Sequence, residues 1–137
     1  MNILHPMLGM IALSGLLILV LLASRLGPII KYWGDLQFAE HSEDLRPQLP
    51  RPLRLITENY NHIFEQPTLF FATCAYIYMA GQTDALHVWL AWAYVGLRVL
   101  HTITQVTVNN VTLRVACFAT SSAFLVGMIV REALKFV

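Results

Sequence analysis

The sequence predicts an all-α integral membrane protein: a bundle of four transmembrane helices. Of its 137 residues 57% are hydrophobic and only 12% are charged, about half the charged fraction of a typical soluble domain. Charge is also unevenly distributed, because eleven of the seventeen charged residues (nine Lys/Arg and eight Asp/Glu) lie between Arg25 and Glu65. A soluble domain of this size could not bury so much apolar surface. The composition therefore argues strongly against a soluble globular enzyme, a nucleic-acid-binding protein and a disordered chain.

Four segments have the length and apolar character of membrane-spanning helices, which need about 20 mostly apolar residues. We predict such helices over residues 3–24, 57–80, 85–107 and 111–133. The first is expected to be retained, because its basic residues follow the apolar run, whereas a signal peptide carries them before it. The whole chain, residues 1–137, is predicted to form a single membrane domain.

The long hydrophilic connector over residues 33–56 contains Pro47, Pro50 and Pro52, which forbid a continuous helix there. We interpret it as a solvated loop, with a lid over a membrane site as the alternative. The chain between the first two spans also carries most of the basic residues: Arg25, Lys31, Arg46, Arg51 and Arg54. Cytoplasmic loops are enriched in Lys and Arg. This connector is therefore predicted to face the cytoplasm, with both termini outside.

The cysteines and several histidines are assigned no chemical role. Cys74 and Cys117 fall inside predicted spans, where cysteine commonly acts as a small apolar residue. We interpret His5, His41 and His87 as interfacial or surface residues. The sequence contains no zinc-ligand spacing, and no metal site is predicted.

Polar residues inside the predicted spans fall on helical stripes. The second span carries Glu58, Asn61, His62 and Glu65, the third carries Tyr94, Arg98, His101 and Gln105, and the fourth carries Asn110, Arg114, Cys117 and Ser121. Ionisable groups are costly in a bilayer and commonly mark functional sites. We therefore assign functional roles to Glu65, Arg98 and Arg114, whereas Asn110 and Ser121 are interpreted as hydrogen-bonding contacts between helices.

The second and third spans are expected to form an antiparallel hairpin that turns near residues 81–82. In such a hairpin, residues whose numbers sum to about 163 lie at the same depth. Glu65 is thus predicted to lie level with Arg98, and His62 level with His101. Glu65 and Arg98 are the expected ion pair, because each removes the cost of burying the other unpaired.

This predicted cluster has an excess of positive charge. Arg98, together with Arg114 just beyond the third connector, outnumbers Glu65. Guanidinium groups bind carboxylates in a bidentate manner. The residues therefore favour an anionic ligand that carries carboxylates, bound in the cytoplasmic half of the bundle.

The run from Asn59 to Pro67 (NYNHIFEQP), followed by Leu97-Arg98, His101 and Arg114, resembles the MAPEG superfamily. The name stands for membrane-associated proteins in eicosanoid and glutathione metabolism, and the resemblance covers roughly residues 50–134. It implies a homotrimer in membrane lipid that binds glutathione, as co-substrate, between neighbouring subunits on the cytoplasmic side. The likeness to bacterial members implies a bacterial inner membrane.

Carried over by position, the resemblance implies a set of glutathione-binding residues: Asn61, His62, Glu65, Arg98, His101, Gln105 and Arg114. Glu65 resembles the glutamate that binds the glutathione amino group. Arg114 resembles the arginine near the thiol, which would stabilise a thiolate as the catalytic residue. His62 falls where the family commonly has Asn, a position that Asn61 could serve.

The chain departs from the family pattern at other positions. Gln105 stands where the eicosanoid enzymes have Tyr, and Val115 stands where some members have Ser. Glu58 stands where some members offer Arg. Arg25, Lys31 or Arg54 are candidates to compensate.

The function expected from the resemblance is that of a glutathione-dependent transferase or peroxidase-like protein acting on lipophilic electrophiles or lipid hydroperoxides. The alternative is a non-enzymatic membrane scaffold or a lipid- or ligand-binding accessory protein. A four-span exporter is disfavoured, because residues 1–34 contain no Asp or Glu. A b-type haem held by His62 and His101 is the remaining alternative.

Overall fold

The computed structural model describes residues 2–33, 55, 66–108 and 110–136, and these are helical apart from short connections. The elements are α1 (Leu4–Trp33), α4 (Pro67–Met79), α5 (Ala85–Val106), α6 (Val111–Ala133) and a terminal 3₁₀ turn, η3 (Leu134–Phe136). The all-α prediction is therefore confirmed. Helices α5 and α6 lie within the segments predicted for the third and fourth spans.

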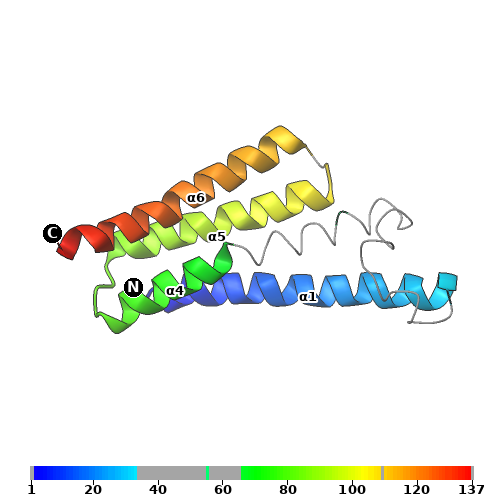
Figure 1. Cartoon of the computed structure of the whole chain (residues 1–137), viewed down its shortest axis with the longest axis horizontal. Helices are drawn as coiled ribbons and strands as arrows, with labels where there is room; N and C mark the ends of the chain where they lie inside the picture. The colour runs from blue at the N-terminus through cyan, green and yellow to red at the C-terminus, as the bar shows by residue number, and fades with distance from the viewer. Residues whose placement is uncertain (1, 34–54, 56–65, 109, 137) are drawn as a thin grey trace.

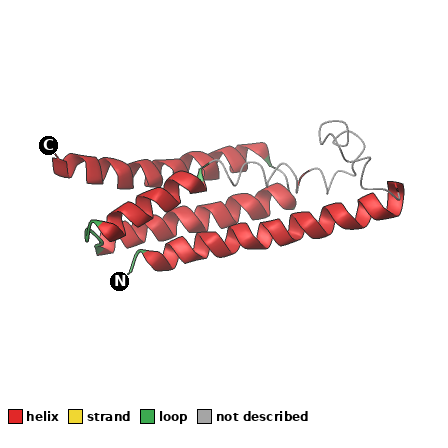
Figure 2. Ribbon diagram, turned by 60° about the horizontal axis from the view of Figure 1, so that its bottom comes forward, coloured by secondary structure: helices red, strands yellow, loops and turns green. Residues whose placement is uncertain are grey.

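The four helices lie side by side with their axes roughly aligned (Figures 1 and 2). Both chain ends and the α4–α5 turn are at one end of the bundle, which we call the terminal end. The α5–α6 connection is at the opposite end (Figure 1). Helices α1 and α5 thus run in the same direction, and α4 and α6 run in the other.

Local sequence signals account for where the helices begin and end. Pro67 occupies the first turn of α4, where its missing N–H costs nothing. Gly81 adopts φ +66°, and the backbone N–H of Gln82 donates to the carbonyl of Ile77 (3.0 Å), the glycine-dependent turn that commonly ends a helix. The Asp84 carboxylate then caps α5 by accepting from His87 N–H (2.9 Å). The predicted turn is confirmed.

Stacked rings on α4 and α5 establish the depth relation between these two helices. The rings of Phe70 and Tyr94 stack with centroids 4.4 Å apart and planes 13° from parallel. Two residues that stack this closely lie at the same depth, within one residue of the predicted register. The hairpin prediction is confirmed in its described part, and residues 57–65 lie outside it.

The surface of the bundle is apolar. Apolar residues from all four helices form the core, among them Met10, Cys74, Ala91 and Met128, yet many large hydrophobic side chains of α1, α5 and α6 are exposed. Two helical segments of the described chain, Leu4–Ala23 and Val111–Ala133, are long and apolar enough to cross a membrane. Lipid tails are as apolar as these side chains. That each of the four predicted spans crosses the bilayer, and that residues 1–137 form a single domain, remain predictions.

Candidate functional site

Arg98 is the most deeply buried charged residue of the described chain. Its side chain is only 1% exposed. Its guanidinium carbon lies 5.3 Å from the ring centroid of Tyr94 and 5.2 Å from that of Phe118. Aromatic rings attract a cation at these distances, and the attraction grows when water is excluded. Two aromatic side chains, one from α5 and one from α6, thus hold the guanidinium inside the bundle.

Two nitrogens of Arg98 have no partner within the described residues. Its Nε and Nη2 atoms are buried and make no hydrogen bond there. A buried cation without an anionic partner is costly. The site is therefore cationic and capable of taking a carboxylate, either from a ligand or from elsewhere in the chain.

His101 is joined to the fourth helix by a hydrogen bond. Its Nδ1 lies 3.1 Å from the backbone carbonyl oxygen of Arg114. Because a carbonyl can only accept, Nδ1 carries the proton and donates, which assigns the tautomer of the neutral ring. Arg114 belongs to the first turn of α6, which the Asn110 side chain caps by accepting from Leu113 N–H (3.2 Å). One bond thus fixes the start of α6 against α5.

Three predicted site residues of α5 lie on one buried face. Arg98, His101 and Gln105 are all buried, and the side chain of Gln105 lies beside His101. Arg114 is half-buried at the edge of this group. Asn61, His62 and Glu65 lie outside the described residues, so the predicted Glu65–Arg98 pair and the haem alternative stay untested.

The contact of Phe118 with Arg98 was not predicted from the sequence, although the α5–α6 register implies it. Helices α5 and α6 are antiparallel, and the His101–Arg114 contact fixes their register. One turn deeper on each helix, Arg98 must face Phe118. A reader of the sequence could place this pair only after choosing the length of the α5–α6 connection.

A second polar cluster, at the terminal end, corrects the interpretation of His87. That side chain is fully buried, not a surface residue. Its Nδ1 lies 3.1 Å from Asp84 Oδ1, and its Nε2 lies 3.1 Å from Glu132 Oε1. Lys135 Nζ also lies 2.5 Å from Glu132 Oε1. The prediction failed because the C-terminal turn of α6, whose place the sequence does not reveal, covers this histidine.

Asp84 and Arg131 form a bidentate ion pair in the same cluster. Arg131 Nη1 donates to Asp84 Oδ1 at 2.7 Å, and Nη2 donates to Oδ2. The Arg131 guanidinium holds the pKa of Asp84 well below its usual range. This pair ties the start of α5 to the end of α6.

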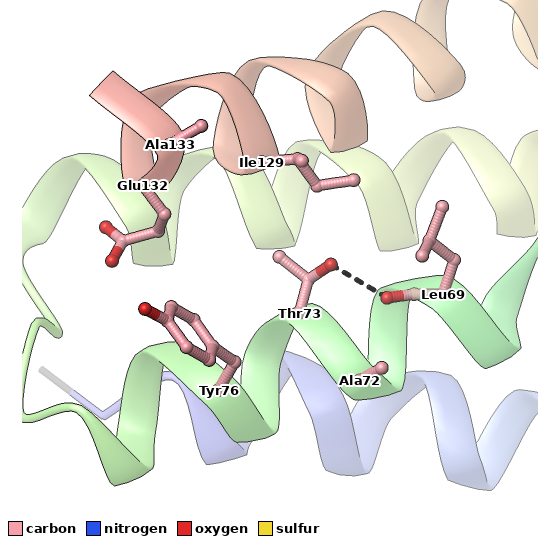
Figure 3. A pocket seen from close by; sticks show the side chains of 7 residues that line it. All are labelled: Leu69, Ala72, Thr73, Tyr76, Ile129, Glu132 and Ala133. Atoms are coloured by element: carbon pink, nitrogen blue, oxygen red, sulfur yellow. Dashed lines mark hydrogen bonds between the residues drawn. The ribbon is translucent and has the colours of Figure 1, made fainter. Parts of the chain in front are cut away.

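A groove of about 430 Å³ opens between α4 and α6 (Figure 3). Its lining residues are Leu69, Ala72, Thr73, Tyr76, Ile129, Glu132 and Ala133. The Thr73 hydroxyl is satisfied by the Leu69 carbonyl (2.8 Å), as the dashed line in Figure 3 shows. No predicted site residue lines the groove, so it is separate from the Arg98 site. Among the described residues, no group of three or more His, Cys, Asp or Glu side chains could hold a metal ion.

The fold and site define a helical membrane protein with a buried cationic site. The sequence profile of the MAPEG family matches residues 3–134, nearly the whole chain, and the chain belongs to this family. Membership indicates a membrane function related to glutathione or eicosanoids. No curated protein and no solved structure matches the chain.

Proposed function

We propose that this protein is a membrane-embedded, glutathione-dependent transferase or peroxidase-like enzyme that acts on lipophilic electrophiles or lipid hydroperoxides. The observation that carries the proposal is the buried Arg98, whose Nε and Nη2 donors are unpaired within the described chain. Such a group suits the carboxylates of glutathione. Family membership supports glutathione as the co-substrate.

Each site residue has a proposed role. Arg98 and His101 bind glutathione together with Asn61, His62 and Gln105, and Glu65 holds its amino group. Arg114 lies beside the sulfur and stabilises the thiolate, which is the reactive nucleophile. The hydrogen bond from His101 to the Arg114 carbonyl supports these roles, because it holds the two helices of the site together.

The proposed chemistry begins with the thiolate attacking the lipophilic substrate. With an electrophile, a bond forms between sulfur and carbon, and the leaving group departs with its electron pair. With a lipid hydroperoxide, sulfur bonds to the terminal oxygen, the O–O bond breaks and the alcohol is released. The resulting sulfenic acid is reduced by a second glutathione, which yields the disulfide and water.

The proposed assembly is a homotrimer in a bacterial inner membrane, with glutathione between subunits. The site and the 33–56 connector face the cytoplasm, and the apolar substrate enters laterally from lipid. The exposed apolar side chains of α1, α5 and α6 support a setting in which either lipid or neighbouring subunits cover the bundle.

Isothermal titration of the purified protein with glutathione tests this function. We expect wild-type protein to bind, Glu65→Gln to bind more weakly, and Arg114→Ala to lose thiol transfer to a chlorodinitrobenzene-type electrophile. Lys135→Gln is the matched control, because it removes a cation at the terminal end of the bundle. Absence of binding to wild-type protein at millimolar glutathione would sink the proposal.

The second candidate function is a non-enzymatic membrane scaffold or a lipid- or ligand-binding accessory protein. Two observations favour it: the fully buried Gln105 stands where a Tyr contacts the ligand in the eicosanoid enzymes, and Val115 is 60% exposed and apolar. Glutathione binding without transferase or peroxidase activity, together with copurification of a partner, would support this candidate over the enzyme.

A further inference from the structure

Helix α1 turns one stripe of side chains into the bundle, and Ser14 is the polar member of that stripe. The buried positions at its start and along its described part are Ile3, Pro6, Met10, Ser14 and Leu17. Spacings of three and four residues place them on one face of a helix. Ser14 is only 7% exposed, so its hydroxyl lies within the bundle and away from the outer surface.

The packing of α1 on α5 fixes the depth of Ser14. A Cβ added to Gly9 would lie 3.3 Å from the Trp92 ring and 3.7 Å from Val95 Cγ1, so Gly9 lies between the levels of these residues. The two helices run in the same direction (Figure 1) and rise equally, by about 1.5 Å per residue. Five residues further along, Ser14 lies level with residues 97–100. Of these four, Arg98 is the one that is buried.

The Ser14 hydroxyl differs from several other hydroxyls of the described helices and resembles that of Thr102, which is also buried without a partner there. Serine and threonine in helices commonly donate to a carbonyl one turn back, and Thr73, Thr104, Ser121 and Ser122 all do so. The buried Ser14 Oγ makes no hydrogen bond within the described chain. Leaving a buried hydroxyl unpaired costs free energy. Its placement therefore points to a partner that enters the bundle.

At the same depth, the nitrogens of Arg98 that lack a partner in the described chain lie along one edge of its planar guanidinium group. Nε and Nη2, the unpaired nitrogens, are the two donors along one side of the guanidinium. A carboxylate binds this side with two parallel hydrogen bonds. The rings of Tyr94 and Phe118 lie near the guanidinium. Neither ring carries a negative charge, and Nε and Nη2 make no hydrogen bond within the described residues, so this edge can take an incoming carboxylate.

We propose that Ser14 is a ligand-binding residue contributed by α1, whose hydroxyl donates to the carboxylate held on the Nε/Nη2 edge of Arg98. This inference rests on the proposed function, because the carboxylate is taken to be one of the two that glutathione carries. Three donors from two helices then surround one carboxylate. The site selects a free carboxylate over its amide, because an amide cannot accept as a charged group and brings its own donors to the same edge.

The test compares glutathione with its two monoamides, in each of which one carboxylate is replaced. Binding is measured by titration calorimetry on wild type, Ser14→Ala, Ser14→Thr and Thr73→Val. Ser14→Ala is expected to weaken glutathione binding about tenfold, the worth of a hydrogen bond to a charged group. Ser14→Thr retains a hydroxyl and should restore most of the affinity. Thr73→Val, which removes a hydroxyl already bonded in its own helix, should bind like wild type.

The affinity of one monoamide distinguishes a ligand contact of Ser14 from a merely structural role. It should bind wild type and Ser14→Ala equally, because it lacks the carboxylate that Ser14 contacts. Ser14→Ala should also melt no earlier than wild type without ligand, since its hydroxyl has no partner in the described chain. Weakening of glutathione and both monoamides by the same factor would assign Ser14 a structural role and overturn the inference.

The remaining outcomes separate this inference from the proposed function. Tight glutathione binding that Ser14→Ala leaves unchanged overturns the inference alone. If Ser14→Ala has no effect on glutathione binding in a Glu65→Gln background, the carboxylate that Ser14 contacts belongs to Glu65. That result also overturns the inference. Failure of wild type to bind glutathione overturns the proposed function, and the inference with it.

Discussion

At the residue scale, His101 offers the clearest link between structure and stability. Replacing it with Leu removes the donor to the Arg114 carbonyl, which then lacks this hydrogen bond. We expect a loss of about 1 kcal/mol in the free energy of unfolding, measured by thermal melting in detergent. His101→Asn, whose amide nitrogen can take the place of Nδ1, is the control and should recover part of the loss. Equal melting of the Leu and Asn variants would contradict the role of the hydrogen bond.

Asp84 carries a prediction for pH dependence. Its pKa is lowered in the folded protein by Arg131, so its stabilising effect is complete above the unfolded value of about 3.9. The effect declines as pH falls from there through the lower folded-state pKa. Asp84→Asn keeps an oxygen for the α5 cap and loses the charge. It should therefore melt earlier than wild type at neutral pH, with a gap that narrows below about pH 4. A gap independent of pH would exclude the ion pair as its cause.

Helical spacing in the sequence predicts which side chains lie on the same face of a helix. It does not predict which neighbouring helix packs against that face. Arg98, His101 and Gln105 share a face because of helical spacing, and the structure confirms that this face is buried. Burial of His87 and the contact of Phe118 with Arg98 both depend on the position of α6. Helical periodicity within one segment contains no information about that position.

At the scale of elements, a side-chain bond ties the start of α4 to α6. Gln66 Nε2 donates to Ser122 Oγ at 2.7 Å, directly before Pro67. We expect Ser122→Ala to lower the free energy of unfolding by about 1 kcal/mol, because the half-buried Gln66 amide loses its acceptor. Ser121→Ala is the control, since the Ser121 hydroxyl bonds only to its own helix in the described chain. A larger loss in Ser121→Ala than in Ser122→Ala would contradict this assignment.

The α4–α5 hairpin marks the limit of what sequence could predict about elements. Gly81 and the short connection fix the turn, and the turn fixes the register that brings Phe70 onto Tyr94. The same reasoning predicts that Glu65 and Arg98 lie at one depth, but Glu65 lies outside the described residues. Helix α1 is joined to α4 by a long connector, so no comparable register could be assigned, and Ser14 was not recognised from sequence.

At the scale of the whole molecule, the arrangement of the helices and the distribution of charge give one prediction for orientation. Both chain ends and the α4–α5 turn share one end of the bundle, opposite the α5–α6 connection (Figure 1). The positive-inside rule predicts that the terminal end faces the periplasm. Position 82 in the α4–α5 turn and position 108 in the α5–α6 connection are exposed and at opposite ends. They form a matched pair of reporters.

We expect Gln82→Cys to react with a membrane-impermeant maleimide in intact cells, and Val108→Cys to react only after the membrane is permeabilised. The native Cys74 and Cys117 are buried, so wild-type protein is the blank and should label slowly on either side. If only Val108→Cys is labelled in intact cells, the predicted orientation is wrong and the Arg98 site lies toward the periplasm. That site could then not draw on cytoplasmic glutathione. The experiment thus decides whether the α5–α6 end of the bundle faces the compartment that the proposed chemistry requires.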